Sequence, residues 1–398
     1  MRKEILFILM IVLAFNVKSQ EYKIDTNNKG LLTLDADVYC FYKDNEYIGY
    51  TAYGYTLPGV RLNPSISFQA TKNLKLSVGF SALKYWGANV YPAYNYVSVP
   101  KYSNDNTQKD FHYMPTFSVN WQINKNLNFI MGNIYHYSYH LLNEPLFNRE
   151  LEYTEDNEEG LQLLYNGKLF KSDVWLNWQN FNFYDDVDRE QFLFGFSSKI
   201  IPIDKTFGFD IPLSFMWQHH GGELDTIDAP LDHWSNGSVG LDLFYKPNTK
   251  YLNKITASIN YYFSKDLKNN TWRFKSGYAF CPSIRLENKN NDLTFGYYSS
   301  EKMISFYGSA FFSNLAQRDT NIIYPKNNVF FLSYYYNMNL GKNYDISFQT
   351  EWFYKEKTTI NKIDVKETER AKISFSFGVV LKAKPKIKLN KVKNLEYE

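Results

Sequence analysis

The chain has little of several features that mark common protein classes. It has only two cysteines, Cys40 and Cys281, in 398 residues, which excludes a disulfide scaffold and a thiolate zinc site. Its 20 glycines and 13 prolines are too few for a collagen-like or low-complexity chain. Beyond the N-terminus no apolar run approaches the roughly 18 residues of a membrane-spanning helix, and the mean hydropathy is −0.44. A formal charge of +3 gives no reason to expect a nucleic-acid partner.

The first nineteen residues have the layout of an export signal. Arg2 and Lys3 precede an apolar run over residues 5–15, and Val17 and Ser19 occupy the small −3 and −1 positions before Gln20. No cysteine follows the expected cleavage point, so a lipid anchor is not expected. We predict a signal peptide over residues 1–19 and a short periplasmic lead-in over residues 20–29.

From residue 31 onward, apolar and polar residues alternate with a period of two, which is typical of strands with two different faces. About sixteen such segments of roughly nine to fifteen residues can be counted, which suits tilted membrane-crossing strands. Short connections alternate with long ones along the chain. The pattern predicts an all-β, transmembrane antiparallel up-and-down barrel with short periplasmic turns and long extracellular loops.

The two faces of these segments indicate which one meets lipid. A barrel of about sixteen strands is too wide for wall side chains to fill, so the apolar face is expected to point outward. Tryptophans near strand ends on that face fit an interfacial aromatic girdle: Trp86, Trp121, Trp178, Trp217 and Trp352.

Over residues 30–382 the chain resembles Gram-negative outer-membrane barrels of porin type, which implies residence in the outer membrane among phospholipid and lipopolysaccharide. The composition, rich in Tyr, Asn and Lys, is similar to that of Bacteroidota proteins. A basic segment after Leu381 departs from the aromatic end that is usual in such barrels. We interpret residues 383–398 as a periplasmic tail. The oligomeric state stays open.

One local motif favours an enzyme. The segment from His233 through Ser235 and Asn236 to Gly237 resembles the active-site motif of outer membrane phospholipase A, and His-x-Ser-Asn is similar to a lipid A deacylase motif. His233 and Ser235 share one face of a strand, where an imidazole can deprotonate a hydroxyl for attack on an ester. The alternative is a polar strand end at the membrane interface.

The third long connection, near residues 141–158, is acidic. It resembles the third loop of general diffusion porins, which folds into the pore and faces lumen bases, and it predicts a preference for cations. A solvated surface loop is the alternative. These carboxylates are also a candidate site for Ca²⁺ that bridges to neighbouring lipopolysaccharide, and no other cofactor is expected. The acids are Glu144, Glu150, Glu152, Glu155, Asp156 and Glu158, beside Arg149, and the candidate lumen bases are Lys75, Lys254, Arg285 and Lys372.

Taken together, these patterns favour a porin-like channel for passive diffusion of small hydrophilic solutes. An acyl hydrolase using His233 and Ser235, with Asn236 nearby, is the alternative. A non-catalytic adhesion or assembly barrel is the third hypothesis. It would use tyrosines of the first two long loops: Tyr47, Tyr50, Tyr53 and Tyr55, then Tyr91, Tyr94, Tyr96 and Tyr102.

Overall fold

The computed structural model describes residues 23–86, 112–135, 140–180, 189–222, 231–247, 249, 251–268, 274–319, 321–362 and 365–391. The predicted signal peptide lies outside these residues, as do the second group of loop tyrosines, residues 91–102.

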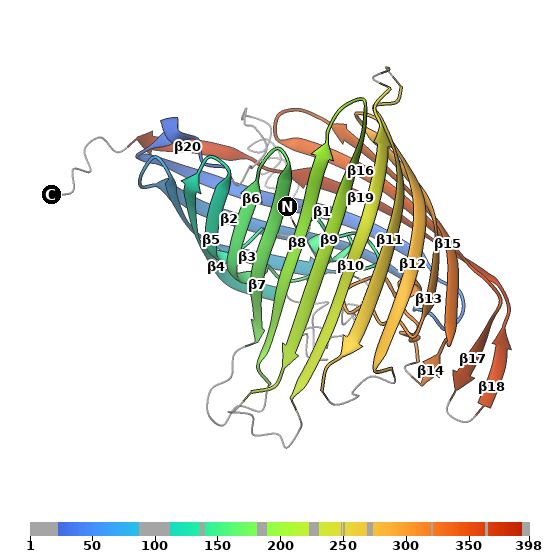
Figure 1. The fold of residues 1–398 in the computed structure, drawn as a ribbon. Coiled ribbons are helices and arrows are strands. Elements are labelled where there is room, and N and C mark those ends of the chain that lie inside the picture. Colours follow the sequence, from blue (N-terminus) through green and yellow to red (C-terminus); the bar gives the residue numbers. More distant parts are fainter. Residues whose placement is uncertain are drawn as a thin grey trace, which may run out of the picture.

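The described chain forms a closed antiparallel barrel of sixteen strands (Figure 1). Each strand pairs with its neighbours along the barrel wall, and β1 closes the barrel by pairing with β19, from Val38 opposite Ala383 to Glu46 opposite Phe375. The wall strands are β1 (Leu31–Glu46), β2 (Tyr55–Gln69), β3 (Leu74–Tyr85), β4 (His112–Asn124), β5 (Leu127–Asn133), β6 (Glu159–Asn166), β7 (Phe170–Asn180), β8 (Gln191–Ile203), β9 (Phe207–His220), β10 (Asp232–Tyr245), β11 (Lys254–Asp266), β12 (Ser276–Glu287), β13 (Asn291–Glu301), β15 (Lys326–Asn339), β16 (Tyr344–Lys355) and β19 (Lys372–Ala383). The predicted fold class and strand number are confirmed.

Short turns lie at the upper end of the barrel in Figure 1, and the strand ends that lead into the long connections lie at the lower end, which we call the long-loop end. A three-stranded sheet stands beyond the barrel at the long-loop end, made of β14 (Ile322–Ile323), β17 (Thr358–Lys362) and β18 (Val365–Glu369). The only helical turns in the described residues are η1 (Thr26–Asn28), α2 (Leu151–Thr154) and η2 (Ala310–Phe312). No helix of the described residues is long and apolar enough to cross a membrane.

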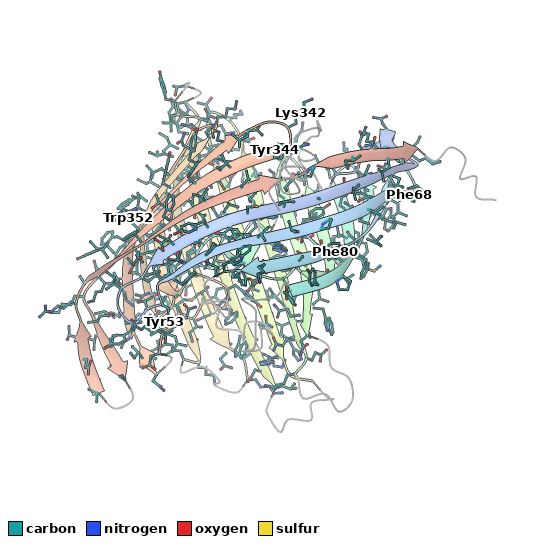
Figure 2. The ribbon with its side chains drawn as sticks, turned by 180° about the vertical axis from the view of Figure 1, so that it is seen from behind. Tyr53, Phe68, Phe80, Lys342, Tyr344 and Trp352 are labelled. Atoms are coloured by element: carbon teal, nitrogen blue, oxygen red, sulfur yellow. The ribbon has the colours of Figure 1, made fainter. Side chains whose placement is uncertain are left out.

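Along the wall strands, side chains alternate between an outer apolar face and a lumen face, as the sequence predicts. On β12, Tyr278, Phe280 and Ile284 are exposed on the outer face, while Ala279 and Cys281 are buried on the lumen side. The predicted girdle tryptophans face outward too, and in Figure 2 Phe80 and Trp352 lie on the outside of the wall. In a bilayer this apolar band meets acyl chains, which is the architecture of outer-membrane barrels.

The C-terminal boundary differs from the prediction. The chain does not leave the wall after residue 382, because β20 (Lys386–Lys391) continues the direction of β19 and pairs with β1 from Asp35 to Leu31. β20 extends from the short-turn end of the barrel (Figure 1). The lysines of β20 fit this position, since a strand that pairs along one edge only, beyond the apolar band, can carry many lysines.

Candidate functional site

The connection between β5 and β6 folds into the barrel. We call its described residues 140–158 the first lumen loop, and this is the acidic loop of the sequence analysis. Its apolar side chains pack in the lumen with the inner face of the wall, and the most buried are Leu146, Phe147, Leu151 and Tyr153.

One end of the first lumen loop is bound to β1 and β16 by buried charges. The Nζ atom of Lys43 lies 3.5 Å from Glu150 Oε2 and 3.3 Å from Glu351 Oε2. Tyr55 donates a hydrogen bond of 2.7 Å to the other oxygen of Glu150. Because all the charged groups are buried, each depends on its partners for stabilisation.

Two more bases hold α2 against the same side of the barrel. Arg61 on β2 donates to the backbone oxygen of Glu152, at 2.6 Å, and to Asn157 Oδ1. Lys382 on β19 lies 2.8 Å from Glu152 Oε1. The helix therefore rests on β1, β2, β16 and β19.

The other side of the loop is fixed by a buried histidine. His140 contacts Asp173 Oδ2 on β7 through Nδ1, at 2.7 Å, and Glu158 Oε2 through Nε2, at 2.6 Å. Its ring stacks on Trp175, with ring centroids 3.9 Å apart. Burial by itself would lower the pKa of His140, but the two carboxylates outweigh burial and raise that pKa to about 10. His140 is thus an imidazolium at neutral pH.

The remaining acids of the loop have different surroundings. Glu144 is fully enclosed and accepts a hydrogen bond from the Arg149 backbone, and burial, with the nearby charge of Glu351, raises its pKa to about 8. Asp156 pairs with His112 at 2.9 Å, near the end of β4. Glu155 is half-buried. Among the described residues, no group of three or more His, Cys, Asp or Glu is arranged to hold a metal ion.

The four bases named from the sequence do not bind this loop. Lys75 pairs with Asp35, at 3.4 Å, and Arg285 pairs with Asp292 and Glu287 near a short turn. Lys254 lies over the Phe244 ring, and Lys372 begins β19 at the long-loop end. The bases that contact the loop are Lys43, Arg61, Lys382 and His140. The first three share the lumen parity, so alternation makes them candidates, but it does not say which bases meet the loop.

Residues 302–319, between β13 and β14, also enter the barrel, and we call them the second lumen loop. Neutral groups hold it. Asn236 on β10 accepts from the Phe306 amide and donates to the Ile304 carbonyl oxygen. Phe311 stacks on Phe353 of β16 at 4.1 Å. The two lumen loops meet where Phe147 forms a parallel bridge with Tyr307.

Two hollows border α2. A polar cavity of about 160 Å³, which we call the inner cavity, is lined by Arg61, Glu152 and Asn157 and continues along β1 to β4. A smaller hollow of about 20 Å³ is lined by Tyr55, Leu151 and Tyr307. The smaller hollow reaches residue 55, at the long-loop end of β2, whereas the inner cavity lies along residues 61–67, closer to the short turn. α2 contributes Leu151 to the smaller hollow and Glu152 to the inner cavity, so it stands between the two.

Of the candidate catalytic residues, His233 and Ser235 lie on the outer face of the wall, at the long-loop end of β10, and Ser235 is buried there. His233 stacks on Trp217, and its Nδ1 lies 3.4 Å from Nδ1 of His219. In the described structure no hydrogen bond joins His233 to Ser235. Asn236 points to the lumen, where it binds the second lumen loop, so it is not beside the other two.

The tyrosines at the connection between β1 and β2 divide into two groups. Tyr47 packs on Phe311 and Tyr55 binds Glu150, so both belong to the lumen packing. Tyr50 and Tyr53 are exposed, and Tyr53 donates to the Arg318 backbone oxygen. In Figure 2 Tyr53 lies at the long-loop end.

Comparison with solved structures shows the same fold. OccAB2 of Acinetobacter baumannii matches with a TM-score of 0.52 at 9% identity, over 91% of this chain and 99% of that one. OccAB1 of the same organism has a TM-score of 0.49 at 12% identity, with 91% and 99% covered. OprD of Pseudomonas aeruginosa has a TM-score of 0.48 at 11% identity, with 92% and 97% covered. Among curated proteins, no relative of the chain is found.

Family models give a more specific result. Residues 24–392, which include every strand of the barrel wall, match the model described as lipid A 3'-O-deacylase-type. The His-x-Ser-Asn motif at residues 233–236 lies within the match. The chain therefore belongs to the lipid A 3'-O-deacylase-type family.

Proposed function

We propose that this outer-membrane barrel is a narrow channel for small hydrophilic solutes. The observation that carries the proposal is the pair of hollows on the two sides of α2, inside a wall whose lumen face is polar. Sixteen strands enclose more space than wall side chains fill, and here the two lumen loops occupy much of it. A solute crossing the barrel has to pass α2, so the passage is narrow.

The charges of the loop favour weak ionic selectivity. Glu150 faces Lys43, Glu152 faces Lys382, and Glu158 faces His140. An acid paired with a base adds little to the field along a pore. We therefore expect a cation preference smaller than six acidic residues would give on their own.

Proteoliposome flux tests the channel directly. The wild-type protein should pass a pentose or hexose and exclude trisaccharides. A variant in which residues 147–154 are replaced by a short Gly-Ser linker should pass the larger sugars and show a higher single-channel conductance. If neither protein passes even the smallest sugar, the barrel is plugged and the channel proposal is wrong.

A second candidate function is hydrolysis of an ester bond in an outer-membrane lipid, and family membership favours it. His233 and Ser235 lie on the outer face near the extracellular end, where acyl chains of the outer leaflet lie. In this reaction His233 would take the proton of the Ser235 hydroxyl as its oxygen attacks the ester carbonyl, and the ester C–O bond would break so that the lipid alcohol leaves with that proton. Water would then hydrolyse the acyl-serine, releasing the fatty acid and restoring the Ser235 hydroxyl. The His233 contact with His219 in place of Ser235 makes this the weaker candidate.

Lipid mass spectrometry separates the two functions. Under the channel proposal, cells with Ser235→Ala keep the wild-type lipid profile. The matched control is Ser238→Ala, a lumen-facing serine on the same strand. Loss of released fatty acid in Ser235→Ala but not in Ser238→Ala would favour the hydrolase.

A further inference from the structure

The inner cavity has features that go beyond a passage for water. Its volume is about 160 Å³, and one ordered water needs roughly 10–15 Å³ of such space, so on the order of ten waters fit. A solute with about that many non-hydrogen atoms fits equally well. The cavity is lined by strands β1 to β4 and by the first lumen loop.

Two oxygen atoms in its wall accept no hydrogen bond. They are Asp37 Oδ1 on β1 and Asn63 Oδ1 on β2, both shielded from solvent. Asp37 and Asn63 are direct partners in the β1–β2 register, so the two acceptors lie side by side. Buried acceptors without a donor cost free energy, and a ligand with hydroxyl groups would satisfy both.

Each charged group around the cavity already has a partner. Lys75 pairs with Asp35, which also lies 3.5 Å from Lys386. Glu152 pairs with Lys382, and Asp37 and Lys384 interact electrostatically across the β1–β19 seam. Arg61 donates to the Glu152 backbone oxygen and to Asn157 Oδ1. A charged ligand would have to replace one of these existing interactions, which favours a neutral ligand.

The rest of the lining is made of hydroxyl and aromatic groups. Ser65, Ser118 and Thr116 supply hydroxyls that both donate and accept. Tyr39 and Tyr135 supply rings with an apolar face and a polar edge. This mixture suits a molecule that carries hydroxyl groups on a compact carbon ring.

We propose that the inner cavity is a binding site for a small neutral polyhydroxylated solute, of the size of a monosaccharide, with Asp37 and Asn63 accepting its hydroxyl protons. The inference rests on the proposed channel function for the route by which the solute arrives. Binding to the purified barrel does not depend on that route.

Three hexose derivatives with one ring and different charges test the site: glucose, glucuronate and glucosamine, with alanine as a zwitterionic rival. Calorimetric titration of the purified full-length barrel in detergent should show glucose binding at least about tenfold more tightly than the other three. Asn63→Leu should weaken glucose binding roughly three- to tenfold. The matched control is Asn260→Leu, a lumen residue on β11 whose Oδ1 is also unpartnered but which lies outside the cavity. It should bind glucose as the wild type does.

A conservative variant controls for loss of binding caused by misfolding. Asp37→Asn keeps an acceptor oxygen and should retain glucose binding, whereas Asp37→Leu should lose it. The inference is overturned if a charged derivative or alanine binds as tightly as glucose or more tightly. It is also overturned if Asn63→Leu and Asn260→Leu lose the same amount of glucose affinity. If flux persists in that case, the channel proposal stands without the site. If glucose binds as expected but no sugar crosses proteoliposomes, the site stands and the channel proposal fails.

Discussion

The two lumen loops are held in the barrel by opposite kinds of interaction. The first, residues 140–158, is fixed by buried charges on two sides, through Lys43 and His140. The second, residues 302–319, is fixed by neutral amides and stacked rings, with Asn236 and Asn314 as its main anchors. Neutral anchors do not respond to pH, whereas charged anchors depend on protonation and fail when one partner is removed. The first loop, which carries α2, is therefore the adjustable one.

The largest effect should come from removing the imidazolium of the first loop. His140→Leu leaves Asp173 and Glu158 buried without their cation, which costs about 3–5 kcal/mol. We expect a lower urea midpoint and faster hydrogen exchange over residues 140–158. The control is His112→Leu, whose pair with Asp156 is partly exposed and is worth less than about 1 kcal/mol. Unchanged exchange in His140→Leu would mean that this histidine does not anchor the loop.

A smaller loss is expected from the neutral anchor of the second loop. Asn314 accepts from the Met303 amide and donates to the Tyr324 carbonyl oxygen. Asn314→Leu leaves both groups buried without a partner, at a cost of about 2–3 kcal/mol. The same urea titration measures it, and Gln317→Ala in the same loop should cost little. A loss equal to that of the control would contradict the assigned role.

The pH response should distinguish the loops further. The folded-state pKa of His140 is about 10, above the ordinary 6.5, so its contribution to stability is full below pH 6.5 and is lost as pH rises through 10. Hydrogen exchange of residues 140–158 should accelerate between pH 9 and 10.5, beyond the intrinsic pH effect, while residues 302–319 keep their protection. In His140→Leu this transition should disappear. If the transition remains, another group causes it.

The smallest effect should come from Glu144. Its pKa is raised from 4.5 to about 8, so the cost of burying its charge is absent below pH 4.5 and complete above pH 8. Glu144→Gln should therefore stabilise the barrel by at least about 1 kcal/mol at pH 9 and by almost nothing at pH 4. Urea midpoints at the two pH values measure this difference. Equal shifts at both would show that the gain does not come from the charge.

Alternation along the chain was enough to predict the barrel, its strand number and the lipid face. It failed at the C-terminus, where β20 carries lysines and still pairs with β1. For the lumen, the sequence indicated the acidic third loop but not its partners. In the structure Lys43, Arg61 and Lys382 lie on the same face of the wall as Lys75 and Lys254. Nothing local in the sequence separates the bases that meet the loop from those that do not.

The wall can be predicted from the chain alone, because strand faces depend on residues two apart and a bilayer around the barrel favours a continuous apolar band. The site depends on contacts between segments that are distant in the chain. Lys43 and Glu351 are 308 positions apart, and they meet because β1 closes onto β19 beside β16. His140 meets Asp173 because the first lumen loop turns inward, where a buried charge without a partner is strongly destabilising. Such pairings follow from closure and from loop burial, and neither leaves a periodic signal in the chain.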